Sequence, residues 1–140
     1  MHPHRIVLAL AVVLLTGCQS DRTKPYPVRG TVMLENGQPT ADLAGGLVTF
    51  TSSEMKTSSI GEIDPDGTFA LSTRKKGDGA IPGTYEVAVS PPIQEERSER
   101  NRKKAQQVPQ YVCVQPSVTV EPKTNEIKLT VRKVTRGKSE

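Results

Sequence analysis

Apolar and polar residues alternate in short segments along most of the chain after Val28. This period of two is typical of strands that bury one face, because successive side chains of a strand point to opposite sides. The pattern predicts seven short strands, of which the polar segment from Thr57 to Ile63 lies near a sheet edge. The predicted inward positions are Val28, Gly30, Val32, Leu34, Val48, Phe50, Phe69, Leu71, Tyr85, Val87, Val89, Val118, Val120, Ile127, Leu129 and Val131.

Turn residues separate these segments and indicate the fold class. Asn36 and Gly37 tolerate the positive φ angles of a tight turn, so residues 35–38 are a hairpin signal. Residues 64–67 and 122–125 are further predicted turns. Because no segment between them carries an apolar helical stripe, we expect an all-β protein. The expected architecture is a seven-stranded antiparallel β-sandwich over residues 28–133.

One charged segment interrupts the alternation. Residues 94–107 contain almost no apolar side chain, and their Glu residues precede their Lys and Arg residues, in the order that a helix dipole favours. A helix this short is marginal in water without an apolar face to pack. We therefore expect a charged loop or short helix at about residues 93–107, and a disordered tail at 134–140.

The first residues have the features of an export signal. Arg5 follows Met1 in a short basic region, and an apolar run then extends from Ile6 to Leu15. These ten residues would span roughly 15 Å as a helix, about half of a bilayer core. The run is too short for a transmembrane helix and has the length of a signal-peptide core. Residues 1–17 are therefore predicted to be a signal peptide.

The residues that follow resemble the bacterial lipobox. Leu15, Thr16 and Gly17 precede Cys18 in the order aliphatic, small, Gly and Cys. The resemblance implies a diacylglycerol on Cys18, cleavage before it, and acylation of the new amino group. Two or more acyl chains anchor a protein stably. Residues 18–27 would then be a tether, and Gln19 favours the outer membrane over the inner one. A soluble secreted protein with a Cys near the cleavage site is the alternative.

Removal of this leader changes which chemistry the chain can perform. His2 and His4 are the only His residues, so the processed chain would contain none, and it has no Trp. Loss of Arg5 lowers the formal net charge from +4 to +3, which is ordinary for a small domain. A Ser-His-Asp triad and a His-bound zinc are thereby excluded. We expect no enzyme, no cofactor and, for an exported chain, no nucleic-acid partner.

Three motifs together resemble a known family. They are residues 28–32 (VRGTV), 64–69 (DPDGTF) and 77–87 (GDGAIPGTYEV). In this order they are similar to the small transthyretin-like or carboxypeptidase regulatory-like lipoproteins of bacteria. The resemblance implies a prealbumin-like sandwich without a known catalytic role. A hydroxyisourate hydrolase of the same fold relies on His residues and a C-terminal Tyr-Arg-Gly-Ser, whereas residues 135–139 here (TRGKS) lack the Tyr.

Several single residues have both a chemical and a structural interpretation. Asp64 and Asp66 suggest a calcium loop, but Lys75 occupies the position of its bidentate Glu, so a plain turn is favoured. Cys113 has apolar sequence neighbours, which favours burial as a small hydrophobe over a redox thiol or an intermolecular disulfide. We expect Tyr85 to bury its ring and to donate its hydroxyl hydrogen to a nearby backbone carbonyl.

Two binding hypotheses remain at this point. The first is a non-catalytic, lipid-anchored cell-envelope protein whose sandwich is a structural or protein-interaction module. The second is a module for anionic glycans or lipid headgroups, although three Glu residues dilute its basic segment. Tyr26 and Tyr111 are the only aromatic candidates for a carbohydrate platform. The candidate anion contacts of the second hypothesis are Arg97, Arg100, Arg102, Lys103 and Lys104.

Intact-mass spectrometry of protein recovered from its natural host tests the predicted processing. We expect a chain that begins at Cys18 and is heavier than the polypeptide by a diacylglycerol and an acyl group. The variant Cys18→Ser should lose this added mass. An unmodified mass for the wild-type chain would contradict both the anchor and the exclusions that depend on loss of the leader.

Overall fold

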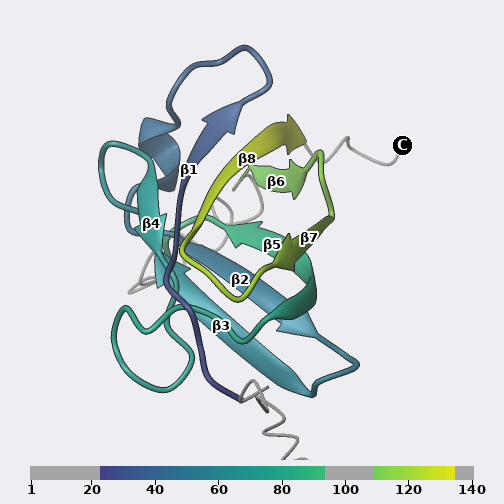
Figure 1. The fold of residues 1–140 in the computed structure, drawn as a ribbon. Helices are drawn as coiled ribbons and strands as arrows, with labels where there is room; N and C mark the ends of the chain where they lie inside the picture. The colour runs from purple at the N-terminus through teal and green to yellow at the C-terminus, as the bar shows by residue number, and fades with distance from the viewer. Residues whose placement is uncertain (1–22, 94–108, 135–140) are drawn as a thin grey trace, which may run out of the picture.

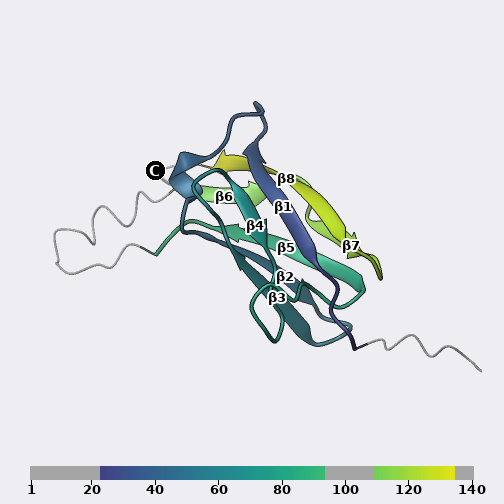
Figure 2. The ribbon, with the colours of Figure 1, turned by 60° about the vertical axis from the view of Figure 1, so that its left-hand side comes forward.

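The computed structural model describes residues 23–93 and 109–134, which form two stacked four-stranded sheets (Figures 1 and 2). One sheet has the order β4-β1-β8-β6, and the other has the order β3-β2-β5-β7. The only helical element among these residues is the 3-10 turn η1, Ala41–Leu43. The strands are β1 Val28–Leu34, β2 Leu47–Ser52, β3 Thr57–Glu62, β4 Thr68–Ala70, β5 Gly83–Ser90, β6 Gln110–Cys113, β7 Ser117–Val120 and β8 Asn125–Val134.

The expected all-β, two-sheet architecture is confirmed, but the expected strand count is wrong. The described residues contain eight strands rather than seven, and the additional one is β6. Its four residues are too short to establish an alternating pattern, and its Val112 is exposed. β3 lies at a sheet edge, as its polar sequence predicted.

The pairing of the first and last strands also differs from the expected antiparallel pattern. β1 and β8 are parallel, from Val28 opposite Asn125 to Leu34 opposite Val131. Every other strand pair in the described residues is antiparallel. Parallel neighbours need a long connection, and here the chain between β1 and β8 passes through the second sheet before it returns.

The segment after β1 is a tight turn that an antiparallel bridge between Met33 and Pro39 closes, but no second full strand follows it. The Gly37 amide donates to the Leu34 carbonyl over 2.8 Å, and the Leu34 amide donates to the Gln38 carbonyl over 2.9 Å. The chain then continues through η1 into β2, which belongs to the other sheet. The turn therefore redirects the chain between sheets instead of pairing two neighbouring strands.

Three aromatic rings occupy the centre of the core. The ring centroid of Phe50 lies 6.5 Å from that of Phe69 and 5.9 Å from that of Tyr85, and both pairs are tilted. Such tilted contacts are favourable for aromatic rings. The Tyr85 hydroxyl donates to the Ile81 carbonyl over 2.8 Å, which confirms its predicted corner role, and burial raises the pKa of this hydroxyl.

The strands of the first sheet pack most closely at Gly30. A Cβ atom there would lie 2.6 Å from Cζ of Phe69 and would also overlap the carbonyl oxygen of Ile127. Both neighbours come from strands that pair with β1, one on each side. Because β1 has a paired strand on both sides, neither contact can be relieved by moving β1 alone.

The strands give the sandwich two distinct ends. The described chain begins beside Ala80, whose carbonyl and amide exchange hydrogen bonds of 2.8 and 3.0 Å with the backbone of Tyr26. We call this the entry end; it also contains the turns that follow Ser52 and Val120. Leu34, Ser90 and Val134 lie at the opposite end, the far end, roughly 26 Å away for an eight-residue strand.

Gly30→Ala is expected to destabilise the domain by about 1–3 kcal/mol, because the added methyl group must displace the Phe69 ring or the β8 backbone. Urea-induced unfolding would measure this loss. Thr31→Ala, on the other face of the same strand, should change the free energy of unfolding by only about 0.5 kcal/mol. Equal stability of Gly30→Ala and the wild type would refute the proposed packing.

Candidate functional site

The residues to which the sequence assigned lipid and anion binding lie outside the described part of the chain. This applies to Cys18 and to the five cations of the charged segment, Arg97, Arg100, Arg102, Lys103 and Lys104. The flanks of that segment are described: Ile93 follows β5, and Pro109 precedes β6. Since β5 ends and β6 begins at the far end, the charged segment leaves and re-enters the domain there.

Asp64 and Asp66 form the turn that the sequence favoured. The Gly67 amide donates to the Asp64 carbonyl over 2.9 Å, and Asp66 Oδ1 accepts hydrogen bonds from the hydroxyl and the amide of Thr68 at 2.6 and 3.0 Å. The hydroxyl bond is the main cause that lowers the pKa of Asp66. Within residues 23–93 and 109–134, no three His, Cys, Asp or Glu side chains group closely enough to hold a metal ion.

Cys113 and Tyr111 serve mainly as packing residues. Cys113 is half-buried against the core, and this burial raises the pKa of its thiol, so the thiol stays protonated at neutral pH. A reactive thiolate requires the opposite shift. Tyr111 is only 8% exposed, so its ring offers no platform for a sugar. Tyr26 is half-buried, and the Lys24 ammonium lies 5.9 Å from its ring centroid.

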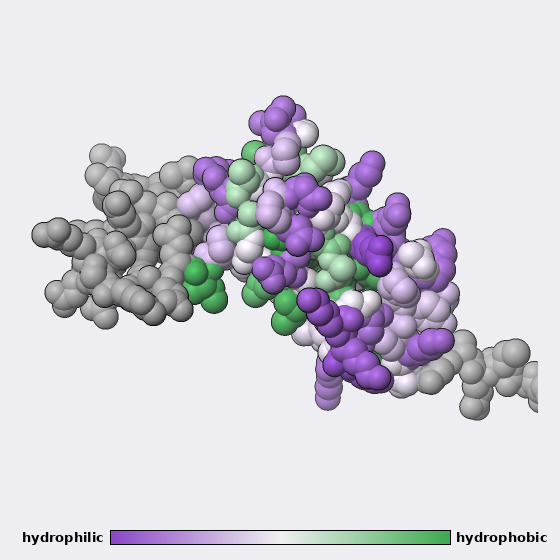
Figure 3. All heavy atoms as spheres, turned by 90° about the vertical axis from the view of Figure 1, so that its left-hand side faces the viewer, coloured by the Kyte–Doolittle hydropathy of each residue, from purple (hydrophilic) through white to green (hydrophobic). Residues whose placement is uncertain are grey.

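A rigid basic loop projects at the entry end between β4 and β5. We use this name for Arg74, Lys75 and Lys76, which are all exposed. Asp78 holds the loop, because its carboxylate accepts backbone hydrogen bonds from Thr73, Arg74 and Lys75 at 2.7, 3.1 and 3.0 Å. Burial raises the pKa of Asp78, but these hydrogen bonds outweigh it and the net shift is downward. Figure 3 shows hydrophilic side chains gathered over this part of the surface.

An apolar strip lies along the edge of the first sheet. Val112, Val114 and Val134, which we call the edge strip, are 55%, 44% and 38% exposed. Val134 pairs with Gln110, and Val112 pairs with Arg132, so the strip follows β6 and the end of β8. Among the described strands, β6 pairs with β8 alone, which leaves its outer backbone edge unpaired. The sequence interpretation missed this strip, because residues 111–114 are all apolar and show no alternation with polar residues.

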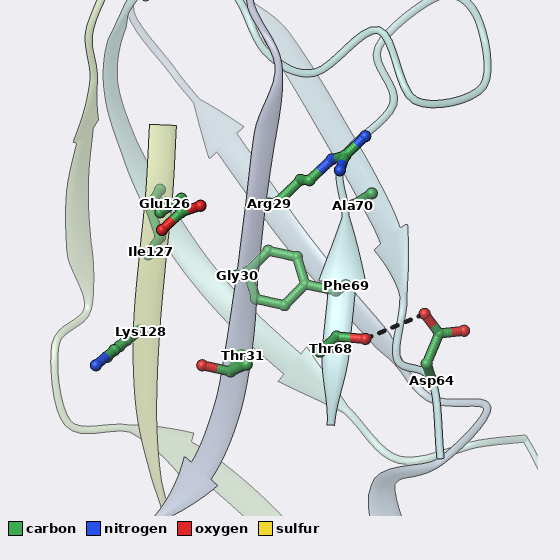
Figure 4. A pocket seen from close by; sticks show the side chains of 10 residues that line it. All are labelled: Arg29, Gly30, Thr31, Asp64, Thr68, Phe69, Ala70, Glu126, Ile127 and Lys128. Carbon is green, nitrogen blue, oxygen red and sulfur yellow. Dashed lines mark hydrogen bonds between the residues drawn. The ribbon is translucent and has the colours of Figure 1, made fainter. Parts of the chain in front are cut away.

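A groove of about 860 Å³ runs over the same sheet, across β4, β1 and β8 (Figure 4). Strand register places Arg29 between Ala70 and Glu126. Figure 4 shows the Arg29 side chain directed toward Ala70 and the ring of Phe69 lying across β1 at Gly30. The remaining lining residues are Thr31, Asp64, Thr68, Ile127 and Lys128.

The groove has the chemistry of a recognition surface. It offers two cations, two carboxylates and two hydroxyls around a backbone floor at Gly30. Its ten lining residues include no His, Cys or Ser. Mixed charges of this kind suit a polar or zwitterionic polypeptide segment rather than a strongly anionic ligand.

Comparison with known proteins adds no assignment to these features. No protein-family model, no curated protein and no solved structure matches the chain. The resemblance to transthyretin-like lipoproteins therefore stays a prediction from three sequence motifs. In the part that the structure describes, no helix is long and apolar enough to cross a membrane.

The Asp78 cradle predicts a pH-dependent contribution to stability. Its pKa is depressed in the folded state, so its contribution is present above the unfolded pKa of about 3.9 and is lost as the pH falls through the folded value. Asp78→Asn should lower the free energy of unfolding by about 1–2 kcal/mol at pH 7. Urea titrations should show this difference shrinking below about pH 4.

Asp42→Asn provides the control for that experiment. Asp42 lies at the far end in an exposed ion pair with Lys133, and such pairs contribute about 0–1 kcal/mol. An Asp78→Asn effect that stayed constant from pH 7 to pH 3 would show that the loop does not depend on the charge of this carboxylate.

Proposed function

We propose that this protein is a non-catalytic, lipid-anchored component of the bacterial cell envelope whose transthyretin-like β-sandwich is a protein-interaction module. The anchor would be the acylated Cys18, and Gln19 after it favours the outer membrane. The edge strip is the observation that carries the interaction role, because it combines exposed apolar side chains with an unpaired strand edge.

The physics of sheet edges supports this assignment. An edge strand presents free amide and carbonyl groups, and soluble proteins usually protect such edges with charges, bulges or a covering segment. β6 instead exposes Val112, with Val134 of β8 nearby on the same face. An extended, apolar segment of a partner could add to β6 as a further strand, with its backbone giving affinity and the valines giving specificity.

The position of the edge strip fits an anchored protein. β6 pairs with the last residues of β8, at the far end, whereas the chain that comes from Cys18 enters at the opposite end. A partner bound to the edge strip would therefore be held away from the membrane surface. This separation leaves the strip accessible while the anchor is in place.

The alternative, anionic glycan or headgroup binding by residues 97–104, gains less support from the described residues. Its flanks lie at the far end, away from the predicted anchor. Its five cations are also diluted by Glu95, Glu96 and Glu99 of the same segment.

Val112→Glu should abolish capture of the partner, because it places a charge in the middle of the edge strip. The measurement is cross-linking in native envelopes followed by affinity recovery of the lipidated protein. We expect the recovered partner to fall at least about tenfold, as for the loss of a central interface residue.

Ile60→Glu is the matched control, since Ile60 is 46% exposed on the other sheet. It should leave recovery of the partner unchanged. Equal recovery by Val112→Glu and the wild type, or equal loss in both variants, would refute the role of the edge strip.

A further inference from the structure

The charges of the described domain are separated along the direction of its strands. Residues 23–93 and 109–134 contain ten Lys and Arg and ten Asp and Glu, so their formal net charge is zero. At the entry end, however, six cations stand against three carboxylates. The cations are Lys24, Lys56, Arg74, Lys75, Lys76 and Lys123, and the carboxylates are Glu54, Asp78 and Glu121.

The far end has the opposite balance. Its five carboxylates, Glu35, Asp42, Glu62, Asp64 and Asp66, outnumber its two cations, and both cations are already in ion pairs. Arg132 lies 2.9 Å from a carboxylate oxygen of Glu35, and Lys133 lies 3.3 Å from one of Asp42. The four remaining charges, on the strands between the ends, cancel one another. Among the described residues, positive charge is therefore in excess where the chain enters.

The cations of the basic loop are available to a ligand. No ion pair is formed by Arg74, Lys75 or Lys76 within the described residues, whereas Lys123 is paired with Glu121. The one carboxylate inside the loop, Asp78, is occupied by three backbone amides. The loop thus exposes three adjacent positive charges without a neutralising side chain.

The loop is also held firmly against the strand by which the chain enters. The Thr73 hydroxyl donates to the Gly79 carbonyl over 2.7 Å, and the Gly77 amide donates to the Ser72 hydroxyl over 2.8 Å. Gly79 has a φ angle of 89°, and a Cβ there would overlap the carbonyl of Tyr26. Backbone contacts therefore hold the basic loop next to the entering segment, which includes Lys24.

We infer that this positive entry end docks on anionic phospholipid headgroups of the membrane that carries the anchor. The inference rests on the proposed function, because acylated Cys18 would place that membrane next to the entry end. Four residues lie between Cys18 and Thr23, so the five Cα-to-Cα steps reach at most roughly 18 Å. The edge strip begins at the far end, so this docking would leave it facing away from the lipid.

The observations favour a membrane over other anions. The three cations are adjacent and exposed in one loop, and the loop between β4 and β5 projects from the sandwich (Figure 1). Basic residues near an anionic leaflet attract it within about one Debye length, roughly 8 Å at physiological salt. The short covalent distance to Cys18 keeps the loop within reach of this field.

Vesicle co-sedimentation tests the inference on protein that lacks the lipid anchor. The protein used is the chain from residue 18 onward with Cys18→Ser, which retains every described residue and all of the described core. It is mixed with phosphatidylcholine vesicles that do or do not contain one-third phosphatidylglycerol. We expect strong preference for the anionic vesicles and a steep loss of binding as salt increases.

Two double variants then locate the binding surface. Lys75→Gln with Lys76→Gln should weaken binding to the anionic vesicles by about tenfold to thirtyfold, as expected for two juxtamembrane cations. Arg132→Gln with Lys133→Gln changes the net charge equally at the far end and should weaken it by less than about threefold. Matching thermal melts of both variants would establish that they fold.

Several outcomes would overturn the inference. They are equal binding to vesicles with and without phosphatidylglycerol, equal loss in the two double variants, and displacement by inorganic phosphate at the lipid phosphate concentration. Tighter binding to dextran sulfate than to the vesicles would assign the loop to polysaccharide instead. Absence of lipid on Cys18 would be a separate result. It would be detected in the mass of the wild-type chain, and it would not change the vesicle measurements, which use the Cys18→Ser variant.

Discussion

The packing of the first sheet depends on one constraint, which is that the space above Gly30 contains no side chain of residue 30. The Phe69 ring occupies that space and reaches Phe50 of the other sheet, so the two sheets are joined through a position that has no side chain. β1 also pairs on both sides, with β4 and with β8, and therefore cannot shift. The backbone at Gly30 also forms the floor of the groove.

The residues that resemble reactive groups are used for structure in this domain. The carboxylate of Asp66 completes a turn with Thr68, and Asp78 ties down the basic loop. The half-buried thiol of Cys113 packs against the core, and the ring of Tyr111 forms part of it. These side chains are satisfied by their neighbours, and what remains for a partner is the surface: an apolar edge, a groove of mixed charge and a positive end.

The two ends of the sandwich therefore suit two different surroundings. In the proposed function, the edge strip faces a protein partner; in the further inference, the entry end faces an anionic membrane. The paired strands lie between these two surfaces and keep them apart.

The sequence alone determined the all-β class, most of the strands, the turns at 64–67 and 122–125, and the corner role of Tyr85, because these depend on residues close together in the chain. The tertiary structure decided that β1 pairs with β8, that Gln110–Cys113 is an edge strand, and that Lys24 and Lys75 share one end with Lys56. These features join segments that are far apart in the chain. Their partners are chosen by packing between sheets, which the alternating pattern does not encode.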